Sequence, residues 1–174
     1  MHQLAVELAG YTGAVLVVTN PVDVLARLVA EISACHRVYG IGANLDTARY
    51  RTLAAAACGV AVEMVDGHVI GEHGDAAVCC LSSTTIDGHP LDSAAVSPGD
   101  LYAALHARSG LITGGIGRVR AGAVGAVLST LGKVLGETDG VEHLSVRYLH
   151  YGWLGLPVRF TRGAAEGVPA AAEL

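Results

Sequence analysis

The chain has 174 residues, 52% of them hydrophobic, and a mean hydropathy of +0.47, which is ample for a packed globular core. Its net charge is −5, and its 11 lysines and arginines are scattered along the chain rather than clustered. Because a nucleic-acid binder or a protein of acidic membrane surfaces needs a basic patch, the composition argues against both classes.

The chain also carries no obvious targeting signal. It opens directly into a short apolar segment, without the basic region and long apolar run of a signal peptide. The most apolar stretch, residues 121–135, is interrupted by polar side chains and falls short of the roughly 20 residues of a membrane span. The four cysteines show no C-x-x-C spacing, which favours reduced thiols. We therefore expect a cytoplasmic protein.

The first sixty residues predict the order strand, helix, strand, helix. Residues 15–19 form an apolar, β-branched run that is typical of a strand covered on both faces, as in a parallel sheet. Asn20 is predicted to cap the next helix, with Pro21 at its first position. A second strand is predicted at residues 37–41. Asn44 is then predicted to cap a helix that ends at Gly59.

Beyond residue 60 the pattern indicates an antiparallel region. Strands are predicted at residues 62–65, 68–70 and 77–86, and Asp87-Gly88 is a hairpin-turn signal. One helix is predicted to start at Ser97-Pro98. Further elements are predicted in the last third of the chain: a helix at 116–135, a hairpin with strands at 146–149 and 157–160 around residues 152–155, and a weak tail at 164–174. Because the helix at 116–135 carries four glycines, we interpret it as a tightly packed interior helix.

Asp46 and Arg49 stand three residues apart near a predicted helix start, so they share one helix face. A D-x-x-R pair of this kind is usually an ordinary surface ion pair. Here it follows the end of one predicted strand, and Asn20 follows the end of the other. Since the carboxyl ends of parallel strands meet at one sheet edge, we expect these polar groups to meet at a ligand site.

His73 lies in the loop segment Gly71-Glu72-His73-Gly74-Asp75, where flanking glycines allow the ring to be aimed. A lone loop histidine is more often structural. A carboxylate such as Asp46, however, would fix its tautomer and raise its pKa, leaving the other ring nitrogen for proton exchange. The alternative, a zinc site with His68, has unsuitable spacing and no cysteine to complete it, so we predict no metal.

Three segments together carry a family resemblance: Thr19-Asn20-Pro21-Val22-Asp23, Asn44-Leu45-Asp46-Thr47-Ala48-Arg49-Tyr50-Arg51 and Gly71-Glu72-His73-Gly74-Asp75. They resemble three successive blocks of the lactate/malate dehydrogenase family. Gly115-Ile116-Gly117 is similar to a further short block, and the similarity runs from about residue 4 to about residue 165.

The resemblance implies a role for each matching residue. His73 would exchange a proton with the substrate oxygen, and Asp46 would orient its ring. Arg49 would bind the substrate carboxylate, and Asn20 would reach both the reacting oxygen and the nicotinamide of NAD. The remaining implied cofactor contacts are Val18 and Thr19.

Several departures from the family pattern affect which substrate and which cofactor contacts the resemblance predicts. The sequence has no Gly-x-Gly-x-x-Gly turn, no acidic residue for the adenosine ribose and no mobile-loop arginine. Glu72, directly before His73, is more similar to the pattern of lactate dehydrogenases than to that of malate dehydrogenases. Ile112 aligns with a substrate-pocket threonine, so malate or a bulkier 2-hydroxy acid stays open. Asp66 replaces the phosphate-binding histidine of allosterically activated enzymes, which argues against activation by fructose bisphosphate.

The expected fold class is α/β followed by α+β. Residues 1–42 would be the carboxyl-terminal part of a Rossmann-type dinucleotide-binding domain, lacking its amino-terminal part, and residues 43–174 the catalytic and substrate domain. The resemblance implies an NAD-dependent, L-lactate dehydrogenase-like oxidoreductase that forms a homo-oligomer, with little activity in this chain alone. The alternative is a non-catalytic remnant that binds small carboxylates or mediates oligomerisation.

Overall fold

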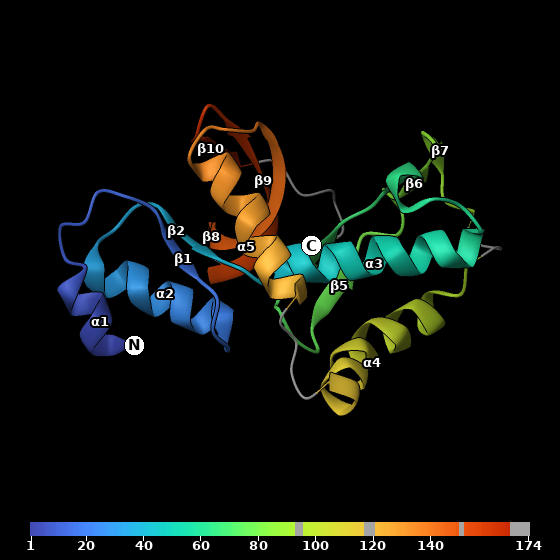
Figure 1. Cartoon of the computed structure of the whole chain (residues 1–174), viewed down its shortest axis with the longest axis horizontal. Coiled ribbons are helices and arrows are strands. Elements are labelled where there is room, and N and C mark those ends of the chain that lie inside the picture. The colour runs from blue at the N-terminus through green and yellow to red at the C-terminus, as the bar shows by residue number, and fades with distance from the viewer. Residues whose placement is uncertain (93–95, 117–120, 150–151, 168–174) are drawn as a thin grey trace.

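The computed structural model describes residues 1–92, 96–116, 121–149 and 152–167 (Figure 1). The molecule is elongated in this view. The helices α1 (His2–Glu7) and α2 (Val22–Ser33) lie at one end, α3 (Ala43–Cys58) runs through the middle, and the smaller sheet lies at the other end. None of the helices in the described part of the chain is long and apolar enough to cross a membrane.

One mixed sheet is the central element of the fold. Its strands stand in the order β1-β2-β8-β9-β4-β5, and β10 also pairs with β9. Its strands are β1 (Val15–Val17), β2 (Val38–Gly40), β4 (Val69–Gly71), β5 (Ala77–Cys79), β8 (Gly140–Tyr148), β9 (Gly152–Thr161) and β10 (Ala164–Gly167). β1 and β2 are parallel, and every other pairing is antiparallel. The expected order, a parallel α/β segment followed by an α+β region, is therefore confirmed, and both parts share one sheet.

Helix α2 begins one residue later than its sequence suggests. Pro21 is the N-cap residue, and the peptide bond from Asn20 to Pro21 is cis. The prediction that Asn20 caps this helix is therefore wrong, since no side chain caps it. Val22 and Val29 on its apolar face are buried against β1 and β2, because the i, i+7 spacing puts both on one side of the helix.

Helix α3 begins directly after β2. Gly42 is its N-cap residue, so the prediction that Asn44 caps it is also wrong. The predicted end is confirmed, because Gly59 adopts the left-handed conformation (φ 67°) that a helix C-terminus favours. The start of α3 lies very close to β9. A Cβ atom on Gly155 would lie 2.4 Å from the Cβ of Ala43, so only glycine fits there.

Two helices flank α3: α4 (Pro98–Ile116) and α5 (Ala121–Val134). The interpretation of α5 as an interior helix is wrong. Leu128 is 62% exposed, and only a stripe that includes Ala126 and Thr130 is buried. Among the described glycines of this segment, the contact is closest at Gly122, where a Cβ would lie 2.7 Å from a methyl carbon of Leu45. Residues 117–120, which the prediction included, lie outside the described residues.

The predicted strand at 77–86 is two strands in different sheets. After β5 the chain turns into β6 (Thr85–Ile86), which pairs with β3 (Val65–Asp66) and β7 (His89–Pro90) in a small three-stranded sheet. The predicted strand at 62–65 is mainly a 3₁₀ helix, η1 (Val62–Met64). The Asp87-Gly88 turn is confirmed, because both residues have positive φ, 50° and 76°, as a type I′ hairpin requires.

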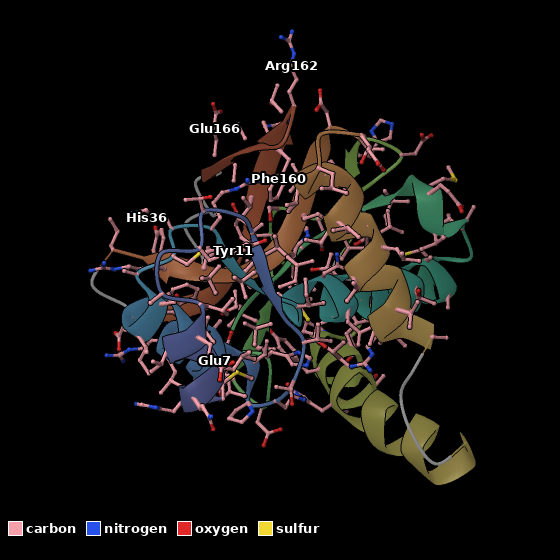
Figure 2. All side chains as sticks on the ribbon, turned by 60° about the vertical axis from the view of Figure 1, so that its left-hand side comes forward. Glu7, Tyr11, His36, Phe160, Arg162 and Glu166 are labelled. Carbon is pink, nitrogen blue, oxygen red and sulfur yellow. The ribbon has the colours of Figure 1, made fainter. Side chains whose placement is uncertain are left out.

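The predicted terminal hairpin is confirmed as β8 and β9, paired from Gly140 with Phe160 to Tyr148 with Gly152. The residues predicted at its turn, 152–155, instead begin β9. At the end of β9, Phe160 is buried against Tyr39, whereas Arg159 and Thr161 on either side of it are exposed. Arg162, just past the strand, projects away from the body (Figure 2). The predicted tail starts as β10, and residues 168–174 lie outside the described residues.

Candidate active site

A cavity of about 350 Å³ opens where β1 and β2 end, between the start of α3, the loop after β4 and the helices α4 and α5. It brings together predicted site residues from three separate segments. Its polar lining residues are Asn20, Asp46, Arg49, His73, Asp75 and His106, and its apolar lining includes Val18, Ile41, Leu45, Ala77, Leu105 and Ala123. Thr19 is not among the lining residues, and the side chain of Ile112 lies outside the described residues.

His73 and Asp46 form the tightest polar contact in this cavity. The ring atom Nδ1 of His73 lies 2.5 Å from Oδ2 of Asp46, and the two side chains are only 17% and 9% exposed. The hydrogen bond to Asp46 raises the pKa of His73, and the negative charges of Asp46 and Asp23 add to this effect. Burial and the nearby Arg49 oppose it, but the net direction is upward. The pair can therefore hold a proton on the imidazole.

The loop that carries His73 is fixed by two contacts. The backbone N–H of His73 donates a hydrogen bond of 2.9 Å to Oδ2 of Asp23, which lies on α2. Its ring packs on the bare backbone of Gly42, where a Cβ atom would lie 2.5 Å from the ring atom Cγ. Sequence reasoning missed both positions as site residues. Asp23 does belong to the first of the three matching segments, whereas Gly42 gave no signal beyond its place at a strand end.

Arg49 lies one helical turn after Asp46 and is only 11% exposed. Its Nη1 lies 3.2 Å from Oδ1 of Asp46, the other oxygen of the carboxylate that holds His73. Within the described part of the chain, Asp46 is the only hydrogen-bond partner of Arg49. Because a guanidinium has five N–H donors in a fixed fork, Arg49 keeps donors with which it can bind a carboxylate in the cavity.

Cys79 in β5 is a candidate nucleophile close enough to feel the charge of Asp46, but its environment argues against that role. Burial, together with the charge of Asp46, raises the pKa of this thiol to about 12. Since the thiolate is the reactive form, Cys79 stays protonated and inert at neutral pH. The described residues also contain no group of three or more side chains placed to hold a metal ion.

His106 on α4 is a lining residue that sequence reasoning missed. Its Nδ1 lies 4.0 Å from Oδ1 of Asp75, and its ring stacks on Tyr102 one turn earlier in the helix. No recognisable motif surrounds His106. Its place in the cavity depends on how α4 packs against α3, which local sequence does not reveal.

The fold and this site define a class: an α/β domain in which a guanidinium and an imidazole share one carboxylate in a cavity. Residues 43–105 match the family described as lactate/malate dehydrogenase, alpha/beta C-terminal domain. The chain is 35% identical over 162 residues to the L-lactate dehydrogenase of Geotalea daltonii, a match that covers 78% of this chain and 52% of that protein. It is 45% identical over 85 residues to the L-lactate dehydrogenase of Halalkalibacterium halodurans, covering 48% and 27% of the two chains.

Solved structures agree with these matches. The minor L-lactate dehydrogenase from Enterococcus mundtii superposes with a TM-score of 0.86 at 25% identity, over 98% of this chain and 60% of that chain. Malate dehydrogenase from Plasmodium falciparum has the same fold, with a TM-score of 0.84 at 20% identity over 96% and 61%. The chain belongs to the lactate/malate dehydrogenase family. It spans about half the length of the Geotalea daltonii protein.

Proposed function

We propose that the cavity is the substrate site of an L-lactate dehydrogenase-like oxidoreductase, which interconverts a 2-hydroxy acid and its 2-oxo acid with NAD. One observation carries the proposal: His73, Asp46 and Arg49 share one cavity and are linked through the two oxygens of a single carboxylate. A proton carrier beside a carboxylate receptor is what this reaction needs. The names of the relatives add support at the level of the family.

In the proposed mechanism, Arg49 binds the substrate carboxylate through N–H groups that Asp46 does not use. Because Nδ1 of His73 faces Asp46, the opposite ring nitrogen, Nε2, is left to exchange the proton. In the reducing direction the imidazolium donates that proton to the carbonyl oxygen. In the oxidising direction the neutral ring accepts it from the hydroxyl group. Asp46 stabilises the charged ring in both directions, which agrees with the raised pKa of His73.

The residues present fit only one end of NAD. Val18 follows β1, is 45% exposed and lines the cavity together with Asn20, so these two residues would contact the nicotinamide. Thr19 is exposed beside them. When bound, the nicotinamide supplies or accepts the hydride. The sequence contains no glycine-rich turn for the pyrophosphate. Since the loss of one preorganised donor typically costs on the order of 3 kcal/mol, we expect slow turnover by this chain alone.

The test is a titration of the purified chain with NADH and pyruvate or oxaloacetate, followed by cofactor absorbance and fluorescence. We expect His73→Ala to reduce cofactor-dependent turnover by about 10²–10⁴-fold and Arg49→Ala to abolish carboxylate binding. Arg27→Ala is the matched control, because Arg27 is an exposed arginine paired with Glu31 on the surface of α2. Turnover that survives in His73→Ala would contradict the proposal. Carboxylate binding that depends on Arg49, without any cofactor-dependent turnover, would favour the non-catalytic alternative.

We also propose that the protein is a homo-oligomer. The outer face of α5, together with Leu135 just past its end, presents an apolar stripe made of Val124, Leu128, Leu131 and Leu135, which are 57%, 62%, 38% and 62% exposed. These side chains recur every three or four residues, so they form one continuous face. A face of this kind is typical of a subunit contact. The molar mass in solution, measured by light scattering, tests the proposal, and a monomer at all concentrations would refute it.

A further inference from the structure

The cavity holds a second histidine–aspartate pair that the proposed reaction does not use. His106 lines the same cavity as His73 and Arg49, and its Nδ1 lies 4.0 Å from Oδ1 of Asp75. The side chain of His106 is 35% exposed, whereas that of Asp75 is fully exposed to water. The cavity therefore contains two imidazoles, and each has its Nδ1 turned toward a carboxylate.

The ring of His106 is held in place by its own helix. It stacks on Tyr102 with the ring centroids 6.4 Å apart and the planes 22° apart. The hydroxyl oxygen of Tyr102 in turn accepts a hydrogen bond of 2.9 Å from the backbone N–H of Cys79 in β5. The stack and this bond tie the α4 side of the cavity to the sheet. An imidazole placed in this way has its Nδ1 toward Asp75 and its Nε2 free to contact a ligand.

The remaining groups of the cavity have other tasks. In the proposed reaction Arg49 binds the first carboxylate of the substrate and His73 the reacting oxygen. The other walls are largely apolar and include Ile41, Leu45 and Leu105. His106 is thus the group of this cavity that is left to recognise a polar end on the substrate's side chain. Asp75 competes with an anionic ligand for it only weakly, because water screens a fully exposed carboxylate.

We propose that His106 is a specificity-determining residue, whose imidazole binds a second carboxylate at the far end of the substrate. A 2-hydroxy acid that ends in a carboxylate would then bind better than one of equal length that ends in a methyl group. This inference rests on the proposed function, since it assumes that Arg49 holds the first carboxylate. The preference for substrates that end in a carboxylate over those that end in a methyl group would then depend on a residue of α4.

The experiment compares two four-carbon ligands, L-malate and L-2-hydroxybutyrate, which differ only in ending with a carboxylate or a methyl group. Binding to the full chain, with NAD present, is measured by calorimetry. We expect His106→Asn to weaken malate binding about fivefold, the upper range for a partly exposed ion pair, and to leave 2-hydroxybutyrate binding unchanged. Asp75→Asn is the matched control. It keeps the imidazole and removes the competing carboxylate, so malate should bind as well or better.

The outcomes separate the two proposals. If His106→Asn weakens the binding of both ligands equally, or of neither, His106 does not determine specificity. If Arg49→Ala leaves the binding of both ligands intact, the proposed function itself fails. Failure of the wild-type chain to bind either ligand would overturn both proposals.

Discussion

The contact between the buried His143 and the half-buried His68 predicts that the fold loses stability in mild acid. His143 lies on β8 and is 5% exposed, and its Nε2 is 2.8 Å from Nδ1 of His68. Burial lowers the pKa of His143 from 6.5 to about 3, and the nearby His68 and Arg51 add to the effect. Between pH 6.5 and pH 3, the unfolded chain therefore binds a proton at this histidine, whereas the folded chain does not. The stabilisation is complete above pH 6.5 and is lost progressively as the pH falls toward 3.

The size of the effect follows from this difference in pKa. Between the two pKa values, each pH unit changes the free energy of unfolding by about 1.4 kcal/mol. From pH 7 to pH 5, allowing for partial protonation near the upper pKa, His143 should contribute a loss of about 2 kcal/mol. That is a large part of the roughly 5–15 kcal/mol by which domains are stable.

Urea unfolding of the wild type and of His143→Gln, at both pH values, measures this contribution. Glutamine cannot titrate but still offers a hydrogen bond to His68. We expect the variant to lose about 2 kcal/mol less than the wild type on acidification. His36→Gln, at an exposed histidine (Figure 2), is the matched control and should follow the wild type.

Two other histidines, His68 and His73, also have shifted pKa values. Burial lowers the pKa of His68, which is present in all three proteins and therefore adds to the acid sensitivity of each. The raised pKa of His73 has the opposite sign, because its stabilisation is present below 6.5 and is lost as the pH rises through its folded pKa. His73 is present in all three proteins, so its contribution cancels. An unchanged pH dependence in His143→Gln would refute the reasoning, since it would mean that His143 is not buried as a neutral side chain.

Three further predictions concern the site and the proposed assembly. Asp46→Asn should lower the pKa of His73, followed by NMR titration of its ring proton, because the main cause of the upward shift is removed; an unaltered titration would contradict the assigned pairing. Gly42→Ala should displace the ring of His73 and destabilise the fold by about 1–3 kcal/mol, since the added Cβ would lie 2.5 Å from the ring. Gly125→Ala, where the Cβ meets nothing within 4 Å, serves as its control in thermal unfolding, and equal losses in both would argue against a steric cause. Leu128→Glu should reduce the molar mass in solution without changing the titration of His73, and an unchanged mass would exclude the α5 face as the contact.

Local sequence predicts the parallel part of the fold well, because short apolar runs there are separated by clear helix signals. It fails at residues 77–86, where an apolar run passes into four consecutive serines and threonines with no glycine or proline to mark a break. The division into two strands is set by a distant contact: the hydroxyl of Thr84 lies 2.7 Å from that of Tyr50 on α3 and donates a 2.7 Å hydrogen bond to the carbonyl of Cys80. Because this turn is fixed by a contact with a helix residue 34 positions away in the sequence, the local sequence does not predict it.

The contacts of the site likewise divide into those that local sequence predicts and those that it does not. Asp46 and Arg49 meet because they share a helix face, which spacing alone predicts. The contact of His73 with Asp46 was expected as well, from two segments that each end at the same sheet edge. Asp23 and His106 could not be assigned in this way. Their contacts depend on how α2 and α4 dock, and docking is decided by packing over the whole core rather than by the residues nearby.

The continuity of the main sheet bears on any attempt to dissect the protein at residue 42, the domain boundary that the sequence suggests. Gly40 of β2 pairs with Ser145 of β8, Asp23 accepts a hydrogen bond from the backbone of His73, and Arg37 donates to the carbonyls of Val134 and Gly163, so several interactions cross that boundary. An excised piece covering residues 43–174 would lose Val18 and Asn20 from the cavity wall and leave one edge of β8 bare. Engineering a minimal version of this site therefore requires grafting the first parallel strands along with it.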